Sequence, residues 1–334
     1  MELRKDYVLP RFVYIAANRA KRPRDLAKKE QLLQNGESDN DGGESAKAHL
    51  LSKASCPFCP GNEIMTTCEI GRIPLQGSKD LWDMRWFKNK FPIADLKGNN
   101  KINTDNNFFT YSDSFGRHEI LVETNNHTEQ FWDFSPKRVT QIFKIYVERE
   151  NELKKIKGIQ YVVIFKNHGE QAGISLIHSH SQILAINHIP AIVLQKSINS
   201  SKYGDCAYCR ILNIEKDSLR RVFETENFVS FTPYASRSMF EVNIFPKRHV
   251  RFLSELEENF DELSEILLRI LKRLKVINAP FNINFIESPN SFDLHFHISI
   301  EPRLSTWAGV ELTGTYVNSM SPEDAAAFYR GEFE

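Results

Sequence analysis

Apolar residues recur at intervals of three and four in two long stretches of the chain, which predicts two amphipathic helices. The first begins at Ser135-Pro136, a capping residue followed by a proline that suits the first turn, and it ends at Gly158. The second begins at Ser254, with Glu257 three residues later as in a capping box. Because each helix has one apolar face, we expect both to pack on a sheet. The predicted buried positions are Val139, Ile142, Phe143, Tyr146, Val147, Leu153 and Ile156 in the first helix, and Leu256, Phe260, Leu263, Ile266, Leu267, Ile270, Leu271 and Leu274 in the second.

Segments rich in β-branched and aromatic residues predict the strands of that sheet. They are HEILVET from His118, YVVIFK from Tyr161, ISLIHSHSQILAI from Ile174, FEVNIF from Phe240, FNINFI from Phe281 and FDLHFHISI from Phe292. Strands of this kind combined with the two helices predict an α+β fold.

The order of these features is the same in two successive parts of the chain. Each part runs through a Cys-x-x-Cys pair, a strand ending near a histidine, a long helix, a second strand and a strand bearing His-x-His. HEILVETNNH ends at His127 and FEVNIFPKRH ends at His249, and the His-x-His pair begins 51 and 46 residues later. We therefore predict two tandem half-domains, residues 1–190 and 191–334, each an antiparallel sheet with one long amphipathic helix.

Composition narrows the class of protein. The 334 residues are 41% hydrophobic and 26% charged, as in an ordinary globular protein, and 43 basic residues balance 43 acidic ones. Zero net charge disfavours a broad nucleic-acid surface. No run of 18 apolar residues occurs, and the first residues lack the apolar core of a signal peptide, so we expect a cytoplasmic protein that does not span a membrane. The polar, glycine-rich segment 34–47 predicts a mobile surface loop.

The cysteines suggest metal ligands rather than disulfides. Four of the five form two Cys-x-x-Cys pairs, a pattern typical of metal sites in a reducing compartment, and Cys68 is expected to be a packed small residue. The alternative is that the cysteines are free thiols. The repeat favours two independent structural zinc sites, since zinc prefers four sulfur and nitrogen ligands. The predicted ligands are Cys56, Cys59, His127 and His178 in the first site, and Cys206, Cys209, His249 and His295 in the second.

The run from His178 to Gln182, HSHSQ, carries the candidate nucleophile. On a strand, His178, His180 and Gln182 would share one face, and His178 is already assigned to the metal. His180 is then left beside a rigid anchor, and a neutral imidazole is a good nucleophile toward phosphorus. The alternative is an ordinary buried histidine, which is also how we interpret His118, His168 and His188.

Two further segments suggest phosphate binding. The loop from Asn167 to Ser175 carries two glycines that allow its backbone amides to approach phosphate oxygens closely. Arg19 and Arg22 offer forked cations for a diphosphate. The alternatives are a simple turn and a solvated basic cluster.

At these motifs the chain resembles the galactose-1-phosphate uridylyltransferases, a branch of the histidine-triad superfamily, over nearly its whole length. The motifs are RAKRP from Arg19, CPFCPGNE from Cys56, NKFP from Asn89, GRHEILVETNNH ending at His127, NHGEQAGISLIHSHSQ from Asn167, HFHISIEPR from His295 and AGVEL from Ala308. The resemblance implies two histidine-triad-like half-domains, with a catalytic His-x-His-x-Gln in the first and a non-catalytic His297 in the second. It also implies a homodimer, with some substrate contacts crossing the subunit interface.

The resemblance also implies roles for single residues. His180 would carry the nucleotide and Gln182 would steady the phosphoryl group. The implied substrate-binding residues are Arg19 and Arg22 at the diphosphate, Asn89 and Phe91 near the base and ribose, Asn167, Gly173 and Ser175 around the phosphate, and Glu311 at the hexose.

The function implied is transfer of UMP from UDP-glucose to galactose 1-phosphate, in galactose metabolism, by a ping-pong mechanism. Ser179 stands where many relatives have proline, and Val310 and Val317 replace a tyrosine and a glutamine. The Cys206/Cys209 pair is similar to the ADP-glucose phosphorylase branch. The alternative is therefore a phosphorylase that uses inorganic phosphate on ADP-glucose or a dinucleoside polyphosphate. Related hydrolases carry a third histidine at the position of Gln182. A zinc-stabilised binding module is disfavoured by the neutral charge and the absence of interleaved basic and aromatic residues.

Overall fold

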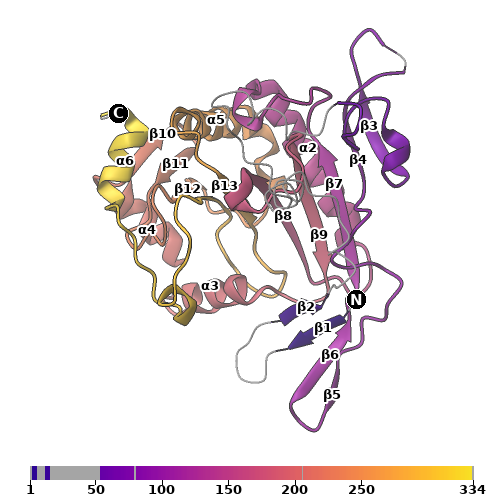
Figure 1. The fold of residues 1–334 in the computed structure, drawn as a ribbon. Coiled ribbons are helices and arrows are strands. Elements are labelled where there is room, and N and C mark those ends of the chain that lie inside the picture. Colours follow the sequence, from indigo (N-terminus) through magenta and orange to yellow (C-terminus); the bar gives the residue numbers. More distant parts are fainter. Residues whose placement is uncertain (1, 6–11, 16–52, 79, 205, 333–334) are drawn as a thin grey trace, which may run out of the picture.

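The computed structural model describes residues 2–5, 12–15, 53–78, 80–204 and 206–332. Its main feature is one sheet of ten antiparallel strands, in the order β10-β11-β12-β14-β13-β8-β9-β7-β4-β3 (Figure 1). The strands are β3 Glu69–Pro74, β4 Trp82–Lys88, β7 Gly116–Val122, β8 Tyr161–His168, β9 His180–Ile186, β10 Arg221–Glu224, β11 Phe228–Phe231, β12 Val242–Pro246, β13 Phe281–Ile286 and β14 His297–Pro302. This architecture confirms the predicted α+β class.

The remaining elements flank that sheet. A second, four-stranded antiparallel sheet has the order β2-β1-β6-β5. Its strands are β1 Glu2–Lys5, β2 Phe12–Ile15, β5 Asn103–Asp105 and β6 Phe109–Asp113. The α-helices are α2 Pro136–Lys154, α3 Ala191–Ser201, α4 Ala207–Glu215, α5 Phe260–Val276 and α6 Pro322–Arg330. The short 3-10 helices are η3 Glu63–Met65, η4 Phe131–Asp133, η5 Glu170–Ala172, η6 Leu253–Asn259 and η7 Glu311–Thr313. None of the helices in these described ranges is long and apolar enough to cross a membrane.

The ten strands divide into two sets with the same internal order. Outward from the central β13–β8 pair, one side runs β8, β9, β7, β4, β3 and the other runs β13, β14, β12, β11, β10. Within each set the strand that follows the long helix lies at the centre, and the strand bearing His-x-His is next to it. We call residues up to 190 the N-terminal half and the residues after 190 the C-terminal half.

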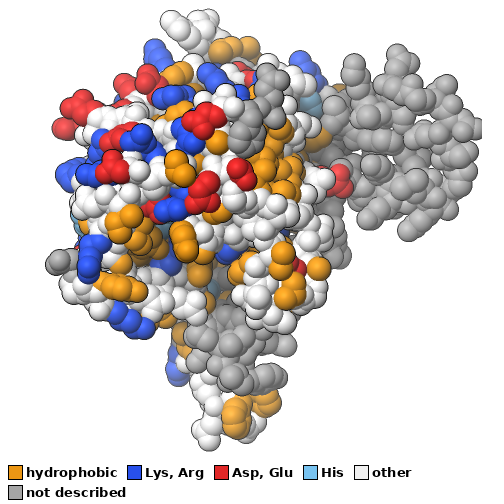
Figure 2. Space-filling view, turned by 90° about the vertical axis from the view of Figure 1, so that its left-hand side faces the viewer, with side chains coloured by type: hydrophobic (Ala, Val, Ile, Leu, Met, Phe, Trp, Pro, Cys, Tyr) orange, Lys and Arg blue, Asp and Glu red, His pale blue; other side chains and the backbone are white. Residues whose placement is uncertain are grey.

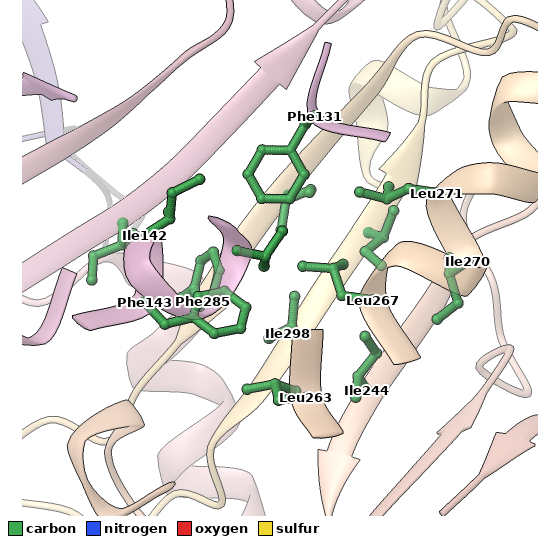
Figure 3. Packing of buried hydrophobic residues seen from close by; sticks show 14 of the residues in the cluster. Phe131, Ile142, Phe143, Ile244, Leu263, Leu267, Ile270, Leu271, Phe285 and Ile298 are labelled. Carbon is green, nitrogen blue, oxygen red and sulfur yellow. The ribbon is translucent and has the colours of Figure 1, made fainter. Parts of the chain in front are cut away.

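The main core lies between one face of the large sheet and helices α2 and α5. The apolar faces of these helices are buried as the periodicity predicts, and Phe143 of α2 contacts Phe260 of α5 with ring centroids 5.5 Å apart. Figure 3 shows Phe143, Leu267 and Ile298 meeting in this core from α2, α5 and β14. Helices α3 and α4 pack on the opposite face, where Val193 and Leu212 are buried against the strands. The sheet is therefore covered by helices on both sides of its C-terminal half.

Three elements begin several residues later than predicted. The strand expected from Ile174 begins at His180, and the one expected from Phe292 begins at His297. Residues before His180 leave the sheet because Leu176 and His178 pack against the Cys-x-x-Cys loop. The second long helix begins at Phe260, after the 3-10 helix η6, and its predicted cap at Ser254 does not form. The Glu255 carboxylate accepts from the backbone N–H groups of two preceding residues instead.

The first long helix begins as predicted but ends at Lys154 rather than at Gly158, so Ile156 lies beyond it. Ser135 caps it by accepting a hydrogen bond from the Arg138 N–H, and Pro136 occupies the first turn. The predicted loop over residues 34–47 lies outside the described residues. On the face of the molecule shown in Figure 2, basic and acidic side chains are interspersed, as the balanced charge suggests.

Candidate active site and metal-binding clusters

A cavity of about 510 Å³ opens on the face of the sheet opposite α2, within the N-terminal half. It brings together seven of the residues that the sequence analysis selected. They are Asn89, Phe91, Asn167, Gly173, Ser175, His180 and Gln182. Residues from strands β8 and β9 and from two loops thus converge on one concave site, which is the arrangement expected of a small-molecule site.

One ring nitrogen of His180 is hydrogen-bonded to the protein backbone. Its Nδ1 lies 2.9 Å from the carbonyl oxygen of His178, which can only accept, so Nδ1 carries the proton and the lone pair lies on Nε2. Phe58 meets the ring edge-on, with centroids 5.1 Å apart. Burial lowers the pKa of His180 to about 4, against the opposing effect of this hydrogen bond. The ring is therefore neutral at physiological pH, with a lone pair available for nucleophilic attack.

Gln182 is oriented by His118, a residue that the sequence analysis took for an ordinary strand histidine. The Ile93 N–H donates to His118 Nδ1 at 3.2 Å, so Nε2 carries the proton and donates to Gln182 Oε1 at 3.0 Å. This bond turns the NH₂ group of Gln182 toward other partners, as a phosphate-binding role requires. The repeat could not reveal His118, because the C-terminal half has no histidine at the equivalent position. Gln182 pairs with Ile120 and its counterpart Ser299 pairs with Asn243, so the residue equivalent to His118 is Glu241.

A buried ionic network supports the strand behind His180. Lys166 Nζ donates to the Glu123 carboxylate at 2.6 Å, to Ser179 Oγ at 3.0 Å and to the His180 carbonyl at 3.1 Å. Ser179 Oγ donates to the same carboxylate at 2.7 Å. Lys166 and Glu123 are almost fully buried, so the pair is shielded from water and holds the backbone of His180 in place.

Both glycines of the loop between β8 and β9 have a positive φ, a conformation that favours glycine. Gly173 adopts a left-handed conformation, φ +84°, with nothing within 4 Å of where a Cβ would lie. Asn282 of β13 donates to Asn167 Oδ1 at 2.8 Å and to the Ala172 carbonyl at 3.0 Å. A side chain from the C-terminal half therefore positions this loop.

Glu311, another predicted substrate-binding residue, is not among the described residues that line the cavity. Glu311 lies in η7 and accepts a hydrogen bond from the Ala308 N–H at 2.8 Å. Arg19 and Arg22 lie outside the described residues. His168 stacks on Phe281 with ring centroids 4.8 Å apart, and His188 contacts Asn187, so both are placed as ordinary histidines.

The first predicted ligand set forms a closed cluster. The donor atoms of Cys56, Cys59, His127 and His178 all lie within 4.8 Å of one another, and all four residues are buried. Cys59 Sγ lies 3.2 Å from His127 Nδ1 and 3.5 Å from His178 Nδ1. The second ring nitrogen of His178 is fixed by the Thr124 carbonyl at 2.8 Å.

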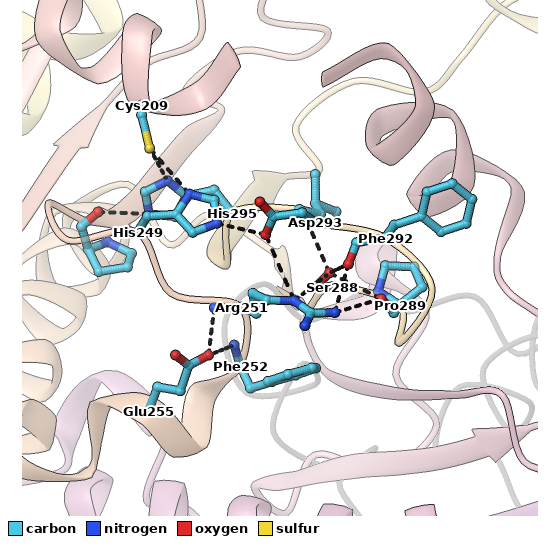
Figure 4. Close-up of polar contacts among 12 residues, drawn as sticks. Cys209, His249, Arg251, Phe252, Glu255, Ser288, Pro289, Phe292, Asp293 and His295 are labelled. Carbon is cyan, nitrogen blue, oxygen red and sulfur yellow. Dashed lines mark hydrogen bonds and ion pairs between the residues drawn. The ribbon is translucent and has the colours of Figure 1, made fainter. Parts of the chain in front are cut away.

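The second predicted ligand set also comes together, but nearer the surface. Cys206, Cys209, His249 and His295 lie within the same limits, and only His295 is fully buried. Cys209 Sγ lies 3.3 Å from His249 Nδ1 and 3.4 Å from His295 Nδ1, as Figure 4 shows. The outer nitrogen of His249 contacts Asp293 at 2.9 Å, and that of His295 contacts the Pro246 carbonyl at 3.0 Å.

Both clusters have the chemistry of metal sites. All four histidines of the two clusters present Nδ1 inward. For three of them, His178, His249 and His295, an outer group accepts from Nε2, which is the usual support for a ligating histidine. Burial raises the pKa of Cys56 and of Cys209 to about 12, so a cation is needed to hold either sulfur as a thiolate. Cys68 belongs to neither cluster and is exposed, so the prediction that it is packed is wrong.

His297 occupies the place of His180 in the C-terminal half, but its ring is closed off. Its Nδ1 lies 3.0 Å from the His295 carbonyl, as in the first half, and its Nε2 lies 2.9 Å from Lys196 Nζ. The ring also stacks on Phe245 with centroids 4.7 Å apart.

Comparison with known proteins agrees with this geometry. A family model described as galactose-1-phosphate uridyl transferase, N-terminal domain, matches residues 1–190. The ADP-glucose phosphorylase of Arabidopsis thaliana is 30% identical over 98% of this chain and 92% of its own length. A galactose-1-phosphate uridylyltransferase of Thermotoga maritima is 29% identical over 82% of this chain and 88% of its own.

Solved structures give the same result. A uridylyltransferase structure superposes with a TM-score of 0.75 at 25% identity, covering 99% of this chain and 97% of the other. The crystal structure of the Arabidopsis thaliana ADP-glucose phosphorylase with bound ADP-glucose superposes with a TM-score of 0.74 at 28% identity, covering 99% of both chains.

Proposed function

The chain belongs to the galactose-1-phosphate uridylyltransferase family, and from that membership we propose that it is a nucleotidyltransferase that carries a nucleoside monophosphate on His180. The observation that carries the proposal is the His180 ring, which lines the cavity with Nδ1 bound to the His178 carbonyl and its lone pair on Nε2. We propose UDP-glucose as donor and galactose 1-phosphate as acceptor.

In the first step, Nε2 of His180 attacks the α-phosphorus of UDP-glucose, and the bond from that phosphorus to the glucose 1-phosphate oxygen breaks. Glucose 1-phosphate leaves and UMP remains bonded to His180. In the second step a phosphate oxygen of galactose 1-phosphate attacks the same phosphorus, the P–N bond breaks, and UDP-galactose is released. Two displacements through one intermediate give ping-pong kinetics.

Hydrogen bonds in the cavity would stabilise the charges that develop. When Nε2 bonds to phosphorus the imidazole becomes cationic, and the His178 carbonyl dipole at Nδ1 is aligned to stabilise it. The Gln182 NH₂ group, turned by His118, would donate to a phosphoryl oxygen. Asn167, Gly173 and Ser175 would surround the phosphates, Asn89 and Phe91 would contact base and ribose, and Arg19 and Arg22 would contact the diphosphate.

We infer that both Cys2His2 clusters hold zinc in a structural role. A tetrahedral zinc ion, with Zn–S of about 2.3 Å and Zn–N of about 2.0–2.1 Å, separates sulfur from nitrogen by roughly 3.5 Å. The distances from Cys59 and from Cys209 to their histidines, 3.2–3.5 Å, fit that spacing. A bound zinc would fix His178, whose carbonyl orients His180.

We further propose a cytoplasmic homodimer of chains composed of two histidine-triad-like half-domains, residues 1–190 and 191–334. The repeated strand order supports the division. Glu311 lies outside the cavity of its own chain, which is consistent with a hexose contact made across a dimer interface.

A second candidate, an ADP-glucose phosphorylase, is favoured by one observation. The Arabidopsis thaliana relative with that name aligns with 98% of this chain, and it shares the high structural similarity of the uridylyltransferases. The phosphorylase would use the same His180 intermediate, with AMP in place of UMP and inorganic phosphate as acceptor.

One experiment tests the proposal and separates the two candidates. The protein is incubated with UDP-glucose or ADP-glucose labelled in the α-phosphate, denatured, and assayed for label that stays on the protein. We expect label from UDP-glucose, lost on addition of galactose 1-phosphate, and no label on His180→Ala. Label from ADP-glucose that is released by inorganic phosphate would establish the phosphorylase. Wild-type rates of exchange in His180→Ala would refute both.

A further inference from the structure

A second cavity, of about 600 Å³ and lined mostly by the C-terminal half, lies on the same face of the large sheet as the first. Backbone register relates the two positions. In the N-terminal half Phe87, Ile120 and Gln182 lie side by side across three strands. In the C-terminal half Phe231, Asn243 and Ser299 lie side by side across the equivalent strands, and all three line the second cavity.

The Cys-x-x-Cys loops contribute equivalent rings. Phe58, between Cys56 and Cys59, lies 5.1 Å from the His180 ring centroid. Tyr208, between Cys206 and Cys209, lies 5.2 Å from the His297 ring centroid and lines the second cavity. The C-terminal half therefore retains the position and an aromatic wall of the nucleotide cavity.

Lys196 makes the chemical difference between the cavities. It extends from α3 and donates to His297 Nε2 at 2.9 Å, so the lone pair that would attack phosphorus is already used. Lys196 also lines the cavity. The second copy has thus exchanged a nucleophile for an ammonium group, at the position where the first copy would bind the α-phosphate.

Other polar groups around Lys196 suit the rest of a nucleotide. Arg237 is paired with the carboxylates of Glu241 and Glu301, and all three residues line the cavity. One guanidinium leaves one of these two negative charges uncompensated, and the Lys196 ammonium brings this group of four side chains to neutrality. Asn243 Oδ1 is buried and, among the described residues, has no hydrogen-bond partner. Such an acceptor in a cavity wall is costly unless a ligand or water donates to it.

The cavity mouth offers a surface for a base. Tyr234 lines it with 78% of its surface exposed, and Phe231 and the aliphatic chain of Ile192 form the adjoining wall. An aromatic base can stack on such rings, since every base has a π face.

We propose that the second cavity is a non-covalent binding site for a nucleoside monophosphate. The phosphate would bind Lys196, the ribose hydroxyl groups would donate to Glu301 and Asn243, and the base would stack at Tyr234. No bond to the protein forms, because His297 has no lone pair to offer. The inference goes beyond the proposed transfer reaction and does not depend on it.

The test is a titration calorimetry experiment with UMP and AMP on the full-length protein. We expect the wild type to bind two equivalents per chain of at least one of the two. Gln182→Trp, which places an indole in the first cavity, should remove one equivalent. Lys196→Met should weaken the other by about tenfold or more, since it deletes a charge-assisted contact to phosphate, while leaving uridine or adenosine binding within about twofold.

Tyr234→Ala keeps the test decisive if Lys196→Met fails to fold, because Tyr234 is exposed. It should weaken the same equivalent by about fivefold or more through lost stacking. One equivalent per chain in the wild type, abolished by Gln182→Trp, would overturn the proposal. So would two equivalents that neither Lys196→Met nor Tyr234→Ala weakens. Transfer of label to His180 is measured in parallel on Lys196→Met. The number of bound equivalents per chain tests the second cavity whatever the result of that transfer assay.

Discussion

The two halves of the molecule share a strand order but differ in what lies behind the His-x-His strand. In the N-terminal half Lys166, Ser179 and Glu123 form a buried ionic network beneath His180. At the positions equivalent to Lys166 and Ser179 the C-terminal half has Phe285 and Phe296, both part of the apolar core. A buried ion pair adds little stability compared with a packed apolar pair. The first half therefore keeps charged side chains behind the His180 strand, and the second half uses the same space for apolar packing.

On the cavity side of the same strands, the two halves differ in what the imidazole lone pair faces. His180 presents its lone pair to a cavity, and His297 presents its lone pair to Lys196. Both rings keep the hydrogen bond from Nδ1 to the carbonyl two residues before them. A single lysine on α3 therefore occupies, in the C-terminal half, the imidazole lone pair that faces a cavity in the N-terminal half.

The metal clusters should give the largest difference between the halves. Cys59→Ser opens a fully buried cluster that supports His178, so we expect a loss of about 4–5 kcal/mol in unfolding free energy, with zinc falling from two ions to one. Cys209→Ser affects a half-exposed cluster, and we expect about 2 kcal/mol. Zinc analysis and denaturant unfolding measure both. Equal losses for the two variants would contradict the distinction.

The ionic network should give the next largest effect. Lys166→Met leaves the Glu123 carboxylate buried without its cation, which should cost about 3–5 kcal/mol of unfolding free energy. The double variant Lys166→Met/Glu123→Leu imitates the apolar second half and should recover most of that loss. Its rate of nucleotide labelling should still be about tenfold or more below wild type, because the His180 carbonyl has lost its donor. Wild-type labelling by the double variant would show that the network has no positioning role.

A smaller effect is expected on the cavity side of the strand, where Gln182 and its counterpart Ser299 can be compared by their effect on the labelling rate. Gln182→Ala should slow labelling by roughly 100-fold, the effect typical of removing one donor to a transition-state oxyanion. Ser299→Ala, its counterpart in the second half, should leave the labelling rate within about twofold. Single-turnover kinetics with the labelled donor separate this step from product release. Similar rates for both variants would remove Gln182 from the mechanism.

The smallest expected effect is that of pH. Burial lowers the pKa of His180 to about 4, so the ring stays neutral as pH falls from 8 to about 5 and loses its lone pair only when pH falls through 4. The single-turnover labelling rate should therefore be flat between pH 8 and 5. Zinc content is measured at each pH, since protonation of the metal ligands would also lower the rate. A midpoint near 6.5 at full zinc content would show that the ring is not desolvated.

The sequence predicted the metal clusters well because repetition supplied an internal check. Cys56 and Cys206, each followed in the same order by two histidines, converge with them as expected. The helix faces were also readable, because burial follows helical periodicity. Five of the positions predicted to bind substrate, including Asn89 and Ser175, line one cavity.

What the sequence could not predict depends on contacts between distant segments. The strand expected from Ile174 begins at His180 because His178 turns toward the Cys-x-x-Cys loop. His118 acts on Gln182 across a strand pair, and the roles of Lys166 and Lys196 depend on side chains from other elements. None of these residues belongs to a local motif, and each is identified only by the group it touches.

We propose that only one of two equivalent histidines, His180 and not His297, accepts the nucleotide. The most direct test is to incubate the protein with UDP-glucose or ADP-glucose, digest it under mildly alkaline conditions that preserve phosphoramidates, and map the adduct by mass spectrometry. We predict a nucleoside monophosphate on the peptide that contains His180 and none on the peptide that contains His297. An adduct on His297, or an unmodified His180 during active turnover, would contradict it.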